Sequence, residues 1–414
     1  MHLPQEFISY TAALFGPQRW QYFLQAMDTP PATSVRFNPW KCPAAPIFSN
    51  TTVVAWCKHA YWLSERPDFT LDPLFHAGVY YVQEAGSLFL DHVLRNLISE
   101  PVLALDLCAA PGGKSSLMRA ALPEGSMLVS NEPDRRRANI LLENMLKQGH
   151  RDVLVTHNFP RDFQRTNWTF DVILTDVPCS GEGLFRRDEN AVNEWTLANV
   201  HFCQKRQRQI LQEIWPCLRE GGLLIYSTCT FNTHENEENI RFIAEELGAE
   251  ILSVPVNAEW QITGSLLTNW KEPVYRFIPG ITRSEGLFMA VLRKKGTPAK
   301  PALLPASARR HAQAHRLIHI LSDGIPVFEQ KGNEKIPSAA HALSLNTPDN
   351  AYPRAELDLQ QARRYLHRES FALPTDTPKG FVLVTYKGYP LGFMKNIGER
   401  ANNLYPKNWA IHNL

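Results

Sequence analysis

The sequence predicts a doubly wound α/β fold, in which helices cover both faces of a mainly parallel sheet. Short apolar runs alternate with helical patterns between residues 101 and 294, and such alternation is typical of parallel strands joined by helical crossovers. A glycine-rich turn follows the first run, and two later runs each end just before a cysteine. Ligands of such sheets bind at the carboxyl ends of the strands, so these features mark the expected site.

The expected strands of this central sheet are runs rich in Val, Ile and Leu. They are VLALDLCA (102–109), SMLVSNE (126–132), DVLVTHN (152–158), FDVILTDV (170–177), GLLIYSTC (222–229) and GLFMAVLRK (286–294). Helices are expected from the glycine-rich turn to about residue 121, over DRRRANILLENMLKQG (134–149) and over 194–219. The last strand is expected to run antiparallel to the others.

Two flanking segments complete the predicted organisation. SVRFNP (34–39) and TTVVAWCKHAYWL (51–63), mixed with short helical patterns, predict a small N-terminal α/β domain over residues 1–80. The central domain then covers 81–295, and Pro- and Ala-rich residues 296–306 form a linker. FVLVTYKGYPLGFMKN (381–396) predicts two strands around a turn, so residues 307–414 are expected to be a β-rich region.

Composition restricts the class of protein. Of the 414 residues, 44% are apolar and 20% are charged, as in ordinary soluble globular proteins. The sequence has no signal-peptide pattern and no apolar stretch long enough to span a bilayer, so we expect a cytoplasmic protein without a membrane partner. The seven cysteines are odd in number and irregularly spaced, which disfavours a disulfide scaffold, and none forms a CxxC pair, which disfavours a structural metal site.

Charge is distributed unevenly along the chain. The net charge is +2, but residues 301–414 carry a net +5 and the remainder a net −3. This asymmetry favours an anionic partner at the C-terminal end, although an ordinary solvated surface explains it equally well.

The glycine-rich turn LDLCAAPGGKSS (105–116) links a strand to a helix, an arrangement in which free backbone N–H groups can receive a polar ligand. It is not a nucleotide triphosphate loop, because Cys108 stands where that template requires glycine, and Pro111 breaks the GxGxxG pattern. Glu132, at the end of the next strand, can accept hydrogen bonds from a ribose diol. These features favour a nucleoside cofactor without polyphosphate, and S-adenosylmethionine is the common one. A merely solvated Glu132 is the alternative.

Cys179 and Cys229 follow two consecutive strands of the predicted sheet. Neighbouring strands lie about 5 Å apart, so both sulfurs could flank one small substrate. Methylation of cytosine at C5 needs a thiolate that adds to C6, and a second thiol can assist its release. Asp176 could hydrogen-bond the edge of a flipped base, and Lys114 could lower a thiol pKa. Free cysteines more often only fill cores, and we interpret Cys42, Cys57, Cys203 and Cys217 in that way.

These blocks resemble a known family. CAAPGGK (108–114), DVPCSGEG (176–183) and STCT (227–230) are similar to the signature blocks of the Fmu/Sun (Nop2-like) RNA cytosine-5 methyltransferases. HAGVYYVQEAGS (76–87) and EGLFMAVLRKK (285–295) match the flanking blocks, so the resemblance covers about 75–295. The tail from residue 356 resembles the C-terminal PUA-like module of the bacterial ribosomal small-subunit (RsmF-type) members.

The resemblance implies a Rossmann-like S-adenosylmethionine methyltransferase sheet that forms 5-methylcytosine in RNA, most simply in 16S ribosomal RNA. It implies that Cys229 attacks C6 and that Cys179 promotes release. The implied cofactor contacts are Cys108, Ala109, Ala110, Pro111, Gly112, Gly113, Lys114, Glu132 and Asp176. RNA is the expected partner, and we expect the protein to be a monomer.

Two positions depart from the family pattern. Phe159 stands where members often carry an Asp near the adenine, so we expect Asn158 to hydrogen-bond the adenine instead. Gly280 stands where a histidine is common. Arg36, Arg186 and Arg187 are candidates for phosphate contacts or for a charged solvated surface. The tail aromatics of YKGYP (386–390) and NNLYPKNW (402–409) are expected to pack the β-rich module rather than to stack on bases.

Three other functions remain open from the sequence. Transfer RNA could be the substrate, because the core motifs are shared by enzymes that act on both RNAs. A DNA cytosine-5 methyltransferase would use Cys179 as the nucleophile and would give Cys229 no purpose. A non-catalytic ribosome-assembly factor would keep the fold only to bind RNA, but it would not need both thiols and the cofactor loop.

Overall fold

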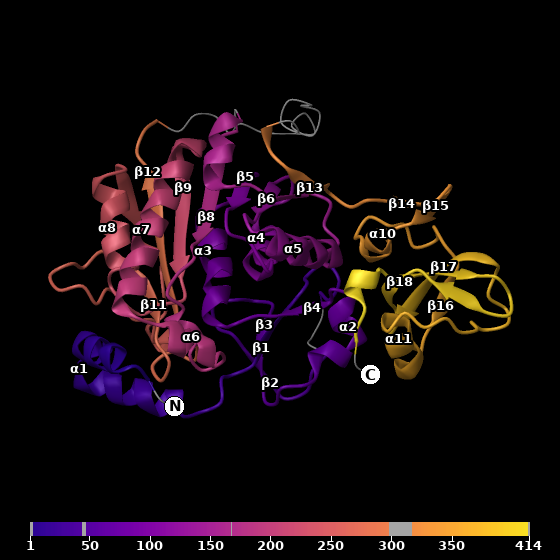
Figure 1. The fold of residues 1–414 in the computed structure, drawn as a ribbon, viewed down its shortest axis with the longest axis horizontal. Helices are drawn as coiled ribbons and strands as arrows, with labels where there is room; N and C mark the ends of the chain where they lie inside the picture. Colours follow the sequence, from indigo (N-terminus) through magenta and orange to yellow (C-terminus); the bar gives the residue numbers. More distant parts are fainter. Residues whose placement is uncertain (1–2, 44–46, 167, 298–316, 413–414) are drawn as a thin grey trace.

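The computed structural model describes residues 3–43, 47–166, 168–297 and 317–412. Figure 1 shows a central α/β body, a small N-terminal sheet beside it, and a β-rich C-terminal module packed next to the N-terminal sheet. This architecture confirms the predicted fold class. The predicted linker falls almost wholly on residues 298–306, which lie outside the described residues.

Helix α1 and a four-stranded sheet form the N-terminal part. The sheet has the order β2-β3-β1-β4 with antiparallel pairing. Its elements are α1 (Gln5–Met27), β1 (Ser34–Phe37), β2 (Thr51–Val53), β3 (Ala60–Leu63), α2 (Pro73–His76) and β4 (Tyr80–Val82). Helix α1 kinks at Gly16, ahead of Pro17, and its buried Phe23 packs edge-on against Phe231 of the central body.

Within the described residues, nine strands form the central sheet, with the order β10-β12-β9-β8-β5-β6-β7-β13 and β11 beside β12. Strands β5 to β9 pair in parallel, and β12 runs antiparallel to β9 as predicted. The strands are β5 (Leu103–Asp106), β6 (Met127–Asn131), β7 (Val153–Thr156), β8 (Phe170–Asp176), β9 (Leu218–Thr228), β10 (Ala249–Leu252), β11 (Tyr275–Phe277), β12 (Leu287–Lys294) and β13 (Ile320–Asp323).

Helices cover both faces of this sheet because alternate strand residues point to opposite sides. Ala104 of β5 belongs to the core under α3 (Phe89–Leu97), α4 (Gly113–Ala121) and α5 (Arg135–Gln148). Its neighbour Leu105 belongs to the core under α7 (Leu197–Ile214) and α8 (Glu237–Glu245). The short helix α6 (Glu189–Glu194) follows the loop after β8.

The C-terminal module contains a second four-stranded sheet with the order β16-β17-β18-β19 and a separate two-stranded sheet, β14-β15. Its elements are β14 (Phe328–Lys331), β15 (Glu334–Pro337), α10 (Ala339–Leu343), β16 (Arg354–Glu356), α11 (Leu359–Leu366), β17 (Gly380–Tyr386), β18 (Tyr389–Asn396) and β19 (Ala401–Asn403). Val35 of β1 and Leu366 of α11 share one apolar core, so the module is fixed to the N-terminal sheet.

Strand β13 departs from the predicted organisation. It lies in the segment 307–414, yet it pairs antiparallel with β7 and becomes the edge strand of the central sheet. The pairing satisfies backbone groups that would otherwise be open on β7. The run LIHIL (317–321) is too short to reveal a strand by its pattern.

Candidate active site

Cys179 and Cys229 face each other at the carboxyl end of the central sheet. Strands β8 and β9 are parallel neighbours, with Asp176 in register with Ser227, so the two following loops begin side by side. The two Sγ atoms are 3.2 Å apart, and both side chains are half-buried. The contact with Cys229, together with burial, raises the pKa of the Cys179 thiol well above its usual value.

Asp176 and Lys114 lie beside the cysteine loops. One oxygen of the Asp176 carboxylate accepts a hydrogen bond from Lys114 Nζ at 2.9 Å, and the other accepts one from the Ser227 hydroxyl at 2.7 Å. Burial opposes the charge of Lys114, but Asp176 outweighs it and holds the pKa of Lys114 above its usual value. The Lys114 ammonium therefore forms an ion pair with Asp176. That Lys114 also lowers the pKa of a cysteine thiol stays a prediction.

The glycine-rich turn wraps against Glu132, as expected of a cofactor loop. Gly112 has φ +114°, a conformation that favours glycine, and α4 begins directly after it. Glu132 is buried, and its carboxylate accepts the backbone N–H groups of Ala110 at 3.3 Å and Asp134 at 3.1 Å. The residues predicted for the cofactor from Cys108 to Lys114 thus lie next to the predicted ribose acid.

Asp106 is a site residue that the sequence reasoning missed. It ends β5, one residue before the loop, and one of its oxygens accepts the Ser115 hydroxyl at 2.6 Å. The other oxygen is buried, and no donor among the described residues reaches it. Burial raises the pKa of Asp106 to about 7. An acid at the strand end directly before the glycine-rich turn was the signal that could have found it.

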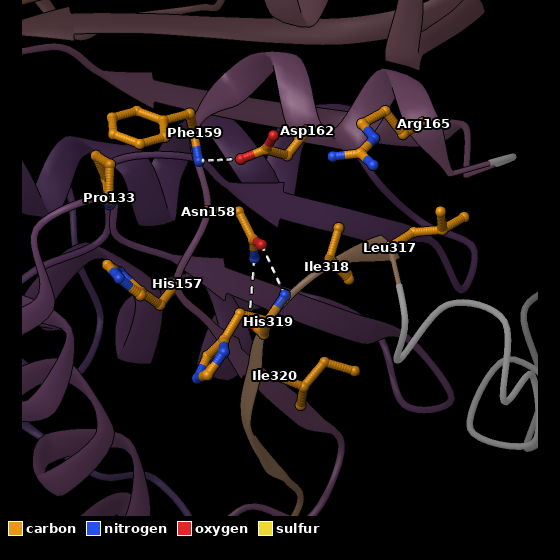
Figure 2. A pocket seen from close by; sticks show the side chains of 10 residues that line it. All are labelled: Pro133, His157, Asn158, Phe159, Asp162, Arg165, Leu317, Ile318, His319 and Ile320. Atoms are coloured by element: carbon orange, nitrogen blue, oxygen red, sulfur yellow. Dashed lines mark hydrogen bonds between the residues drawn. The ribbon is translucent and has the colours of Figure 1, made fainter.

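A cavity of about 490 Å³ opens beyond Glu132, at the ends of β6 and β7. Pro133, Asn158 and Phe159 line one side, and the segment 317–320 that leads into β13 lines the other. Figure 2 shows the Asn158 amide paired with the His319 backbone, through Nδ2 to O at 3.1 Å and N to Oδ1 at 2.7 Å. Phe159 stays 55% exposed at the rim, so it offers an apolar face to a planar ring.

These residues fit S-adenosylmethionine, the cofactor that the sequence and its family resemblance imply. The unpaired oxygen of Asp106 suits a cationic amino group, Glu132 lies at the position of a ribose acid, and the cavity beyond it has room for a base. When bound, this cofactor supplies an electrophilic methyl group. The Asn158 amide has one N–H and one lone pair left beyond its His319 contacts for an adenine.

The structure gives partners within the protein to the three arginines that the sequence left as candidates for phosphate contacts or for a charged solvated surface. Arg186 forms a buried ion pair with Glu285 at 2.5 Å and also donates to the Ala26 carbonyl. Arg187 lies 3.7 Å from the same carboxylate. Arg36 is buried and donates to Gln83 and Ser116. Arg36 thus joins β1 to α4, and Arg186 joins the loop after β8 to α1 and to Glu285.

Gly280 has a steric reason to depart from the family pattern. Its φ is +83°, and a Cβ atom there would lie 2.2 Å from the Tyr22 carbonyl oxygen of α1. Helix α1 therefore leaves no room for a histidine at this position.

The tail aromatics pack, as expected. Tyr386, Tyr405 and Trp409 are buried in the core shared by the N-terminal sheet and the C-terminal module. Cys42, Cys57, Cys203 and Cys217 are buried free thiols, which agrees with a packing role.

Neither a metal cluster nor a membrane span emerges from the part of the chain that the structure describes. No group of three or more His, Cys, Asp or Glu side chains could hold a metal ion there. No helix there has the length and apolar character needed to cross a bilayer.

Comparison with known proteins places this geometry in a family. Residues 96–293 match the sequence model of the 16S rRNA methyltransferase RsmB/F family. Residues 3–85 match the N-terminal domain of 16S rRNA methyltransferase RsmF, and residues 352–411 match the methyltransferase RsmF PUA domain. The chain is 29% identical to the ribosomal RNA small subunit methyltransferase F of Aliivibrio fischeri strain ES114, over 93% of this chain and 92% of that protein. The Salmonella heidelberg protein of the same name is also 29% identical, over 93% and 91%.

Solved structures support the fold. The methyltransferase homolog protein from Pyrococcus horikoshii superposes with a TM-score of 0.56 and 25% identity, over 70% of this chain and all of that one. NSun6 from the same organism, solved with SFG, has a TM-score of 0.59 and 19% identity, over 71% and 99%. With matches that extend from residue 3 to residue 411 and relatives covered over nearly their full length, the chain belongs to the RsmB/F family of 16S rRNA methyltransferases and carries the two terminal domains of its RsmF type.

Proposed function

We propose that this protein transfers a methyl group from S-adenosylmethionine to C5 of a cytosine in 16S ribosomal RNA. The observation that carries the proposal is the pair of thiols 3.2 Å apart beside Asp176, one loop away from the cofactor turn. Cytosine C5 is a poor nucleophile, and covalent addition of a thiolate at C6 is the established way for a side chain to activate such a carbon. Membership of a 16S rRNA methyltransferase family supports the RNA substrate.

Each side chain has one role in this proposal. The Cys229 thiolate forms a bond to C6, which moves electron density to C5, where the methyl group is received. Loss of the C5 proton to water and cleavage of the S–C6 bond then restore the aromatic ring and the thiolate, and Cys179 promotes this release. Asp176, held by Lys114 and Ser227, hydrogen-bonds the N3/N4 edge of the flipped cytosine.

The cofactor side of the proposal uses residues of the first three parallel strands. The turn Cys108–Lys114 and Asp106 receive the amino-acid end, Glu132 binds the ribose diol, and Asn158 contacts the adenine with its remaining N–H or lone pair. The backbone N–H groups of the turn and the start of α4 favour a carboxylate at this place.

Covalent trapping tests the assignment of the two thiols. Cys179→Ala should accumulate a protein–RNA adduct that resists denaturant, because addition proceeds while release does not. Cys229→Ala should give neither adduct nor methylation, and Cys203→Ala, a change at a buried thiol on α7, is the control that should behave as wild type. An adduct trapped equally by Cys229→Ala contradicts the assignment, and full activity of Cys229→Ala would instead favour the DNA-type mechanism.

Bisulfite sequencing of total RNA tests the substrate. Cells that contain the protein should show a protected cytosine in 16S rRNA that is absent from cells without it. Protection confined to transfer RNA would refute the ribosomal assignment. No transfer of labelled methyl to any RNA fragment would favour the non-catalytic assembly factor.

A further inference from the structure

We propose that Glu182 and Glu235 are positioning residues, through which each cysteine loop fixes the loop that carries the other cysteine. This inference rests on the proposed roles of the two thiols. Glu182 follows Cys179 in the loop after β8, and Glu235 follows Cys229 in the loop after β9. Both carboxylates are buried, with exposed fractions of 1% and 0%. We call this pair of residues the reciprocal brace.

Glu235 holds the loop of Cys179. Its carboxylate accepts the backbone N–H of Ser180, the residue directly after Cys179, at 3.0 Å, and also accepts the Ser180 hydroxyl. Gln207 of α7 donates to the same carboxylate at 2.7 Å. The backbone beside the Cys179 thiol is therefore tied to the other loop and to a helix under the sheet.

Glu182 holds the loop of Cys229 in the same way. Its carboxylate accepts the backbone N–H groups of Phe231 and of Asn232, the latter at 3.0 Å. Trp195 donates its indole N–H to the other oxygen at 3.0 Å. The backbone that follows Cys229 is thus fixed by a residue of the opposite loop.

Asn232 joins the two halves of the brace. Its side-chain amide nitrogen donates to Glu182 at 3.0 Å and to Glu235 at 2.8 Å, so one NH₂ group bridges both carboxylates. A direct backbone contact between the loops, from the Gly183 N–H to the Cys229 carbonyl at 2.6 Å, lies beside it. Every donor of this network belongs to one of the two loops or to a segment packed behind them.

The cost of this arrangement argues that it serves the site. Two carboxylates buried close together are unfavourable, and a neutral network would join the loops at lower cost. Burial and the nearby charge of Glu182 raise the pKa of Glu235 to about 7. The two carboxylates are strong hydrogen-bond acceptors for backbone N–H groups of both cysteine loops. These bonds restrict the motion of the loops that carry the two thiols. Catalytic groups must be held within about 0.5 Å of their working geometry, and irregular loops do not achieve this alone.

Thiol cross-linking tests the brace without RNA or cofactor. Dibromobimane becomes fluorescent when it links two thiols, so its reaction with Cys179 and Cys229 reports how well the sulfurs face each other. Glu235→Gln and Glu182→Gln replace one accepting oxygen with an NH₂ group that opposes the donors of the network. We expect each to slow the fluorescence increase at least tenfold, while labelling by monobromobimane and S-adenosylhomocysteine affinity change little in the folded variants.

A matched control lies on the same segment. Glu238 accepts from Gln204 and pairs with His234, and takes no part in the brace, so Glu238→Gln should cross-link as wild type. If Glu182→Gln fails to fold, Asn232→Ala removes the shared donor instead and should also slow cross-linking. The brace would be overturned if Glu235→Gln cross-links at the wild-type rate and a folded Glu182→Gln or Asn232→Ala variant does so too. If the variants cross-link slowly but the wild-type protein does not methylate RNA, the brace stands and only the proposed function is refuted.

Discussion

Addition of a single methyl group at Gly183 should displace the two cysteine loops relative to each other. A Cβ atom on Gly183 would lie 2.8 Å from the Cys229 carbonyl oxygen and 3.0 Å from the Gly286 carbonyl oxygen. Both are backbone atoms that cannot rotate away. Ordinary van der Waals contact starts at 3.4 Å, about 0.6 Å more than the distance from the added Cβ to the Cys229 carbonyl oxygen. Because the surroundings are closely packed, Gly183→Ala should displace the Cys229 loop by about 0.6 Å relative to the Cys179 loop.

A displacement of this size should reduce catalysis much more than binding. Misplacement by about 1 Å can cost about a hundredfold in rate, so we expect the kcat for methyl transfer to fall about ten- to a hundredfold. Transfer of labelled methyl to deproteinised 16S rRNA measures kcat, and titration with S-adenosylhomocysteine should show unchanged cofactor affinity. Gly264→Ala is the matched control, because no described atom lies within 4 Å of the added carbon. If Gly183→Ala retains kcat within twofold of wild type, the close fit of the two loops does not govern the reaction.

Three further predictions concern the cofactor side and the core. Because Asp106 is protonated below about pH 7 and only its ionised form attracts a cationic cofactor, the Kd for S-adenosylmethionine should rise about tenfold for each pH unit below that value. Asp106→Asn should flatten this profile in calorimetry, and an unchanged slope would refute the assignment. Glu237→Gln should lower the free energy of unfolding by about 3–5 kcal/mol, since it leaves the buried Arg276 unpaired; a denaturant midpoint equal to wild type would contradict this. His319→Pro removes the N–H that holds Asn158 and should weaken S-adenosylhomocysteine binding about fivefold, which corresponds to about 1 kcal/mol for one hydrogen bond. His319→Ala keeps that N–H but removes a side chain that lines the cavity, so it should weaken binding less than His319→Pro does.

The sequence predicted those features that local pattern encodes. Parallel strands are buried on both faces, so they leave continuous apolar runs, and the place where each run ends put Cys179 and Cys229 at one edge of the sheet. The tail aromatics were also assigned correctly to packing, because large rings in a small β module are usually needed for its core.

Features that depend on distant partners escaped the sequence reasoning. Arg186 meets Glu285 across 99 positions of sequence, and nothing in the run of charges around Arg186 indicates that partner. Glu182 and Glu235 resemble ordinary loop acids until the fold brings their loops together. The unpaired oxygen of Asp106 can be recognised only when its surroundings are known. Tertiary placement decides each of these cases.

Because strand β13 belongs to the central sheet, the C-terminal segment of this chain is not a separate appendage. After the central domain is complete, the chain returns and adds strand β13 to β7 at the edge of the central sheet, beside the cavity lined by Asn158 and Phe159. A fragment that ended before residue 317 would expose the bare edge of β7, which invites pairing with another molecule. The C-terminal segment therefore joins the central sheet at one edge before it forms its own sheet, and a shortened protein would lose one wall of the cavity together with the PUA domain.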